Sequence, residues 1–122
     1  LYFTGILAFE TDPADVFTDM KAASTPLELG FVLVDVRSRS AYEQEHVINA
    51  INIPHSEITT ERLKDYDKQI IFVVYCWSPG CNGAVKAARK LSAMKRPVKL
   101  MMGGIEYWKK EGYPVIKDHQ VI

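Results

Sequence analysis

Cys76 is the residue of this chain best placed to act as a nucleophile. It follows directly the most apolar run, residues 70–75, and a glycine-containing segment with a helical pattern comes after it. If the run is a strand of a parallel sheet, Cys76 lies at the carboxyl edge, where ligands of such sheets bind. Backbone N–H groups of a tight loop and the N-terminus of the next helix would then favour thiolate over thiol.

The remainder of this loop is the candidate binding element for an anion. Its backbone amides can converge on one point and form a nest for an oxyanion or a persulfide. The expected substrate-binding residues are Trp77, Ser78, Pro79, Gly80, Cys81 and Asn82. A cysteine after a buried strand is often only a small apolar side chain. The glycine-containing loop between strand and helix favours the reactive thiol over that interpretation.

Cys81 is the only other cysteine of the chain. It is a candidate resolving thiol, able to attack a persulfide or sulfenic acid on Cys76 and form a disulfide. The alternative is that it packs at the start of the helix, and both interpretations stay open. A zinc site is not expected, because the two cysteines lack the usual CxxC spacing and no histidine pair lies nearby in the sequence.

The elements that must position Cys76 alternate between strands and helices. Nearly continuous apolar runs predict strands at residues 31–36, 51–54, 70–75 and 98–102, with a further candidate at 6–9. The run at 70–75 is the strongest and is expected to be central. One helix is expected to begin at Asp12-Pro13 and end at Thr25-Pro26. Further helices are expected at residues 60–66, after Gly83, and in the stretch that follows Gly103-Gly104 and runs to Lys110. Such alternation predicts an α/β fold with a parallel sheet between helices.

Composition agrees with one soluble globular domain over residues 1–122. Lys plus Arg and Asp plus Glu both number 15, and the formal net charge is zero. Nucleic-acid binding is therefore not expected, and no apolar run approaches the length of a membrane span. The apolar N-terminal segment lacks a basic leader and is not interpreted as a signal peptide, so a cytoplasmic location is the default expectation.

Three segments resemble the rhodanese family, in the order and spacing of that family. Residues 34–54 contain an aspartate–x–arginine pair, a glutamate, a histidine and an AINIP stretch. Residues 73–91 resemble the strand, active-site loop and helix, and residues 101–115 resemble the closing GG…W…GYP segment. The resemblance implies a five-stranded parallel sheet flanked by helices on both faces. It also implies that Cys76 carries sulfane sulfur as a persulfide, taken from a donor such as thiosulfate and passed to an acceptor such as cyanide or a thiol.

The loop departs from the family pattern in two respects. From Cys76 to Asn82 it has seven residues where the common sulfurtransferase loop has six, and it lacks the arginine that many members carry near its end. The rhodanese-fold phosphatases have seven residues but end in arginine, which a phosphate transition state needs. Asn82 therefore disfavours a phosphatase. Lys86 and Arg89 can supply the missing charge only if the helix presents them to the loop.

Several functions remain open at this point. The leading one is a thiosulfate sulfurtransferase-like enzyme, whose partners are a small sulfur-containing anion or thiol. A second is a non-enzymatic module that relays persulfide sulfur to an accepting protein, and a third is a redox switch formed by Cys76 and Cys81. Asp35 and Arg37 follow a strand and are expected to form a structural pair that supports the next loop. No cofactor is indicated, since the cysteine side chain carries the chemistry.

Overall fold

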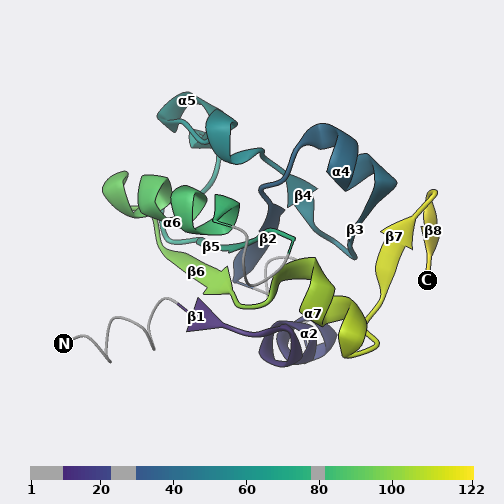
Figure 1. Cartoon of the computed structure of the whole chain (residues 1–122). Coiled ribbons are helices and arrows are strands. Elements are labelled where there is room, and N and C mark those ends of the chain that lie inside the picture. Colours follow the sequence, from purple (N-terminus) through teal and green to yellow (C-terminus); the bar gives the residue numbers. More distant parts are fainter. Residues whose placement is uncertain (1–9, 23–29, 78–81) are drawn as a thin grey trace.

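A five-stranded parallel sheet forms the centre of the computed structural model, which describes residues 10–22, 30–77 and 82–122 (Figure 1). The strand order is β1-β6-β5-β2-β4, and every neighbouring pair in this sheet is parallel. The strands are β1 (Glu10–Thr11), β2 (Phe31–Asp35), β4 (Ile51–Asn52), β5 (Ile71–Tyr75) and β6 (Val98–Met101). The predicted parallel α/β sheet and the central position of the strand before Cys76 are both confirmed.

Helices cover both faces of this sheet. Figure 1 shows α5 (Thr60–Leu63) and α6 (Gly83–Ala93) on one side, and α2 (Pro13–Ala22) and α7 (Gly104–Lys110) on the other. The short elements α4 (Arg39–Gln44) and η1, a 3-10 turn at His55–Glu57, follow β2 and β4 in the chain. Each face has its own apolar cluster, one reaching α5 and α6 and the other reaching α2 and α7.

The two-sided burial explains why the central strands are almost continuously apolar. Along β5, Phe72 and Val74 face the α6 cluster, while Val73 and Tyr75 face the α7 cluster. Successive side chains of a strand point to opposite faces, so a strand covered on both sides needs apolar residues at every position. The neighbouring strand β2 shows the same alternation, and its Val34 is the register partner of Val74.

The helix boundaries also agree with the sequence signals. The Asp12 side chain accepts a hydrogen bond from the backbone N–H of Asp15 at 2.9 Å, and α2 begins at Pro13. In α6 the residues at apolar spacing, Ala84, Ala87 and Leu91, are buried. The expected helix at residues 60–66 is present in a shorter form, as α5.

A second, antiparallel sheet was not expected from the sequence. It pairs β3 (Glu45–Val47) with β7 (Val115–Lys117), and β7 with β8 (Gln120–Val121). The turn between β7 and β8 has Asp118 and His119 at positive φ, which is the backbone of a tight hairpin turn. Strands of two or three residues are too short for their alternation to be recognised in a sequence.

Three expectations lie outside the described residues: the strand at 6–9, the helix end at Thr25-Pro26, and the conformation of the loop at 78–81. In the part of the chain that is described, no helix is long and apolar enough to cross a membrane.

Candidate functional site

Cys76 lies immediately after β5, at the carboxyl end of the central strand. The residue is 6% exposed, and its side chain belongs to the apolar cluster that also contains Val36, Ile53 and Ala84. In this structure Cys76 is disulfide-bonded. Any nucleophilic chemistry at this position therefore begins with the reduced form.

The main chain at Cys76 is held by the first turn of α7. The backbone N–H of Ile105 donates to the Cys76 carbonyl at 3.1 Å, and that of Glu106 donates to the Trp77 carbonyl at 2.9 Å. Gly104 permits this approach, because a Cβ atom at that position would lie 2.5 Å from the Cys76 carbonyl oxygen. Gly104 also has a φ of +61°, which favours glycine. The second glycine of the GG pair noted in the sequence thus allows α7 to approach the main chain of Cys76.

The other end of the loop joins α6. Asn82 is exposed and precedes the helix, which begins at the buried Gly83. The Asn82 side chain makes no capping hydrogen bond, although its carbonyl accepts from the backbone N–H of Lys86 at 3.0 Å. The strand and the helix on either side of the loop are therefore placed as the sequence predicted. The candidate residues Ser78, Pro79, Gly80 and Cys81 lie outside the described residues, so their roles stay predictions.

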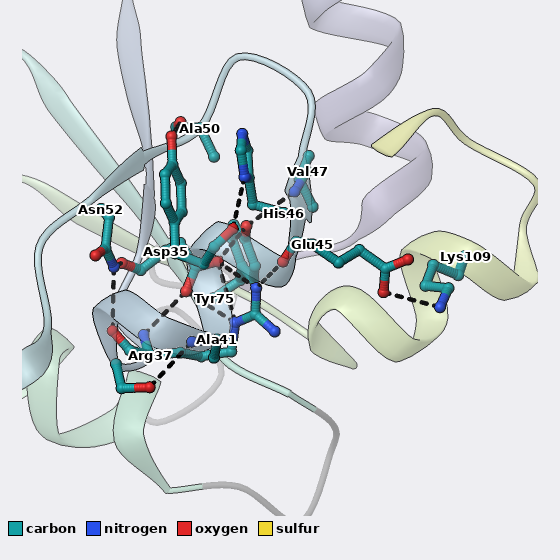
Figure 2. A network of polar contacts seen from close by, with 12 residues as sticks. Asp35, Arg37, Ala41, Glu45, His46, Val47, Ala50, Asn52, Tyr75 and Lys109 are labelled. Atoms are coloured by element: carbon teal, nitrogen blue, oxygen red, sulfur yellow. Dashed lines mark hydrogen bonds and ion pairs between the residues drawn. The ribbon is translucent and has the colours of Figure 1, made fainter. Parts of the chain in front are cut away.

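A buried polar network lies beside this segment, at the carboxyl end of β2 (Figure 2). The Asp35 carboxylate accepts from Arg37 through Nε, at 2.9 and 3.0 Å, and through Nη2, at 2.7 Å. Nη2 of Arg37 also donates to the carbonyl of Glu45. The Tyr75 hydroxyl donates to Oδ2 of Asp35 at 2.7 Å. Asp35 and Arg37 are 0% and 4% exposed, so this is a fully desolvated ion pair.

The protonation states of Arg37 and Tyr75 are fixed at neutral pH. Burial by itself lowers the pKa of Arg37, but hydrogen bonding and the charge of Asp35 raise that pKa overall. Burial, followed by the charge of Asp35, holds the pKa of Tyr75 well above its usual value. Arg37 is therefore a cation and Tyr75 a neutral hydrogen-bond donor.

Arg37 connects this network to the candidate site. Its guanidinium carbon lies 4.3 Å from the centre of the Trp77 ring, and Trp77 is the residue after Cys76. The pairing of Asp35 with Arg37 has the geometry of a structural support, and the stacking on Trp77 adds a contact that spacing alone did not suggest.

Sequence reasoning missed Tyr75 and Asn52. The Asn52 side-chain amide donates to the carbonyls of Asp35 and Arg37 at 2.9 and 3.1 Å, which fixes the backbone around the ion pair. Tyr75 was assigned only to a buried strand. The sequence does contain a signal for Tyr75: its hydroxyl ends a run of hydrocarbon side chains. A buried hydroxyl needs a polar partner, so this residue could have been expected to form a hydrogen bond.

The cationic side chains of α6 differ in their distance from the loop and in their contacts. Nζ of Lys90 donates to the carbonyl of His55 at 2.6 Å, so this side chain reaches from α6 to η1. Lys86 lies one helical turn earlier on the same face, closer to the loop, while Arg89 lies three residues further along α6 than Lys86 and so further from the loop. Both Lys86 and Arg89 are exposed. Within the described ranges, no group of three or more His, Cys, Asp or Glu side chains could hold a metal ion.

Comparison with known proteins identifies the family to which this geometry belongs. A family model described as "Rhodanese-like domain" matches residues 15–111. Two curated relatives are an HTH-type transcriptional regulator, Rv0324 of Mycobacterium tuberculosis, and the thiosulfate sulfurtransferase GlpE of Coxiella burnetii. The regulator is 34% identical over 109 residues, covering 84% of this chain and 48% of its own length. GlpE is 31% identical over 78 residues, covering 64% of this chain and 71% of its own length.

A third relative, the tRNA sulfurtransferase of Thermoplasma acidophilum, is 38% identical over 77 residues, covering 61% of this chain. The chain spans only 15% of that protein and about half of the regulator. Among solved structures, the BH2092 protein of Bacillus halodurans superposes with a TM-score of 0.88 at 39% identity, over 97% of this chain and 83% of its own.

Proposed function

Because the chain belongs to the rhodanese-like domain family, we propose that it is a sulfurtransferase in which reduced Cys76 carries sulfane sulfur as a persulfide. The observation that carries this proposal is the position of Cys76 at the carboxyl end of the central strand, directly before the loop that leads into α6. Sulfurtransferases are among its relatives, which supports the reaction class.

The proposed reaction needs no redox cofactor. The Cys76 thiolate attacks the sulfane sulfur of thiosulfate, a new S–S bond forms, and the S–S bond of thiosulfate breaks to release sulfite. The product is a persulfide anion on Cys76. An acceptor, cyanide or a thiolate, then attacks the outer sulfur and regenerates the Cys76 thiolate. Backbone N–H groups around the loop and the N-terminus of α6 would stabilise the negative charge at each stage.

The absence of an arginine in the loop bears on the choice of donor. Asn82 precedes α6 where many family members have a cation, so thiosulfate is expected to bind weakly. This favours a relay variant of the same proposal, in which the persulfide is passed to an accepting protein. Asn82 also disfavours phosphatase chemistry, because that transition state requires a bidentate cationic donor.

A second candidate function is a thiol–disulfide switch. The observation that favours it is that Cys76 is disulfide-bonded in this structure, and Cys81 is the only other cysteine of the chain. In this scheme, attack of the Cys81 thiolate on a Cys76 persulfide or sulfenic acid forms a disulfide and releases hydrosulfide or water.

Intact mass after reduction and brief incubation with thiosulfate separates the two functions. The parent, Cys76→Ser and Cys81→Ser are compared. A gain of one sulfur atom in the parent and in Cys81→Ser, absent from Cys76→Ser, supports the sulfurtransferase. No gain in the parent, together with loss of two hydrogens under mild oxidation that requires both cysteines, contradicts it and supports the switch.

A further inference from the structure

Arg37 has one hydrogen-bonding group that the buried network leaves unused. Its Nε and Nη2 atoms are engaged by Asp35 and by the carbonyl of Glu45. Within the described part of the chain, Nη1 is buried and has no hydrogen-bond partner. Figure 2 shows the guanidinium held along one edge by the Asp35 carboxylate, with its remaining nitrogen directed away from that contact. A buried N–H group without a partner is costly, so this feature requires a compensating interaction.

The Trp77 ring contacts the face of the guanidinium and contributes part of that compensation. The guanidinium carbon lies 4.3 Å from its centre, well within the range of a cation–π contact, and the Tyr75 ring lies at 6.0 Å. The hydrogen bonds from Nε and Nη2 to Asp35 fix the plane of the guanidinium, so the surface presented to the indole does not rotate. Arg37 therefore presents a cationic surface of fixed orientation to the Trp77 ring.

Burial alone would not hold the Trp77 side chain in one place. Trp77 is 49% exposed. Among the large apolar residues that are exposed in the described part of the chain, no other aromatic residue has a larger exposed fraction. Its carbonyl accepts a hydrogen bond from Glu106 of α7, while its ring lies against Arg37 at the end of β2. Trp77 is thus anchored through its main chain on one element and through its side chain on another.

We propose that Arg37 is a positioning residue for Cys76 and acts through Trp77. The proposal rests on the function proposed above, for which Cys76 must be presented in one orientation at the start of the loop. Cys76 and Trp77 share a peptide bond, so fixing the ring and the carbonyl of Trp77 restricts the backbone on the carboxyl side of Cys76. The ion pair of Asp35 and Arg37 then supports catalysis by a route distinct from folding: it orders the chain that carries the thiol.

The first test compares Trp77→Leu with Trp77→Phe, which keeps an aromatic face for Arg37. Val98→Ala is the matched control, since it weakens the core at the beginning of β6, at the amino ends of the strands and away from Cys76 at their carboxyl ends. We expect Trp77→Leu to slow persulfide formation by roughly tenfold, the order expected for loss of a cation–π contact, with little change in KM for thiosulfate. Trp77→Phe should recover most of the rate, and Val98→Ala should retain it.

A second readout does not depend on sulfur transfer. The rate of alkylation of reduced Cys76 by iodoacetamide, resolved by peptide mass spectrometry, is followed against pH. We expect the profile of Trp77→Leu to move to higher pH, while the profiles of Trp77→Phe and Val98→Ala match the parent. If the parent forms no persulfide, the proposed function fails, but this profile still decides whether Trp77 orders the thiol.

A double-mutant cycle with Arg37→Lys tests whether Arg37 is the anchor. Lysine keeps the charge and loses the planar face, so its effect on the alkylation profile should resemble that of Trp77→Leu, and the double variant should be no worse than either. Additive effects would overturn the coupling. Where Arg37→Lys does not fold, the Trp77 variants decide: a Trp77→Leu variant with the rate and the pH profile of the parent overturns the proposal.

Discussion

The hydroxyl of Tyr75 donates a hydrogen bond to Oδ2 of Asp35 at 2.7 Å, and the two residues are register partners on the adjacent strands β5 and β2. The same hydroxyl accepts from the backbone N–H of Val47, in β3, at 3.0 Å. One side chain thus links the last residue of the central strand to the ion pair and to the second sheet. This link lies directly before Cys76, and its energetic consequences can be measured.

Replacing Tyr75 with phenylalanine should lower the free energy of unfolding by about 1–3 kcal/mol, because the Val47 N–H is left buried without a partner. The ring volume is retained, so little of this loss would come from a cavity. Denaturant unfolding of parent and variant measures it. A variant as stable as the parent would show that the hydroxyl contributes no net stability.

Stability should also depend on alkaline pH through Tyr75. Its pKa in the folded protein is raised well above the usual value by burial and by the charge of Asp35. The stabilising contribution is therefore fully present below about pH 10, where the unfolded side chain begins to ionise, and is lost as pH rises above it. Urea unfolding of the parent and of Tyr75→Phe across this range isolates the effect as a difference. If the free energies of unfolding of the parent and of Tyr75→Phe change with pH in parallel, the prediction is wrong.

Breaking the buried ion pair should cost far more than breaking an exposed one. Asp35→Asn leaves Arg37 charged and buried without its counterion, with an expected loss of roughly 3–5 kcal/mol. The control is Glu57→Gln, which removes the exposed pair with Arg39 and should cost at most about 1 kcal/mol. Thermal or denaturant unfolding of both variants checks the contrast, and equal losses would show that burial of the Asp35 pair has little effect.

Gly104→Ala should disturb Cys76 directly. The new methyl group would lie 2.5 Å from the Cys76 carbonyl oxygen, and the residue also has a φ of +61°. Gly112→Ala is a matched control, since it has a φ of +81° with nothing within 4 Å of the added atom. Both variants should lose roughly 1 kcal/mol or more from backbone strain, but only Gly104→Ala should alter the alkylation profile of Cys76. Identical profiles in the two variants would mean that α7 does not position the thiol.

Lys86 is the cation of α6 best placed to assist an anionic donor. It shares a helical face with Lys90, which reaches the carbonyl of His55, and it lies one turn nearer the loop. Lys86→Gln should raise KM for thiosulfate by about two- to fivefold at low salt, with a smaller effect at high salt because exposed charges are screened. Arg89→Gln is the control and should change KM little. A larger effect of Arg89→Gln would assign the role to the cation further from the loop.

The main elements of the fold were predictable because local sequence and tertiary burial agree in them. The central strand β5 is apolar at every position, and the structure buries both of its faces. Helix α6 repeats small apolar residues at helical spacing, and those residues meet the sheet. The placement of Cys76 followed from these two elements, since a residue between a central parallel strand and a helix lies at the carboxyl edge.

The supporting contacts were not predictable, because each depends on register or on distance across the fold. The hydrogen bond between Tyr75 and Asp35 joins residues 40 apart in the chain and exists only because β5 pairs with β2 in this register. The stack of Arg37 on Trp77 likewise requires the ends of two strands to meet. The antiparallel sheet consists of strands of two or three residues, whose pairing depends on tertiary contacts rather than on a local pattern.

Cys76 belongs to both layers of the molecule at once: its side chain packs with the cluster that reaches α6, and its carbonyl is held by α7 on the other face. A substitution close to Cys76 in the first cluster, or in the first turn of α7, can therefore change the reactivity of the sulfur while the protein stays folded. Loss of activity would then precede loss of structure as such substitutions accumulate. In a library of random variants, the inactive members should include many that remain abundant and folded, with changes near the carboxyl end of β5 on both sides of the sheet.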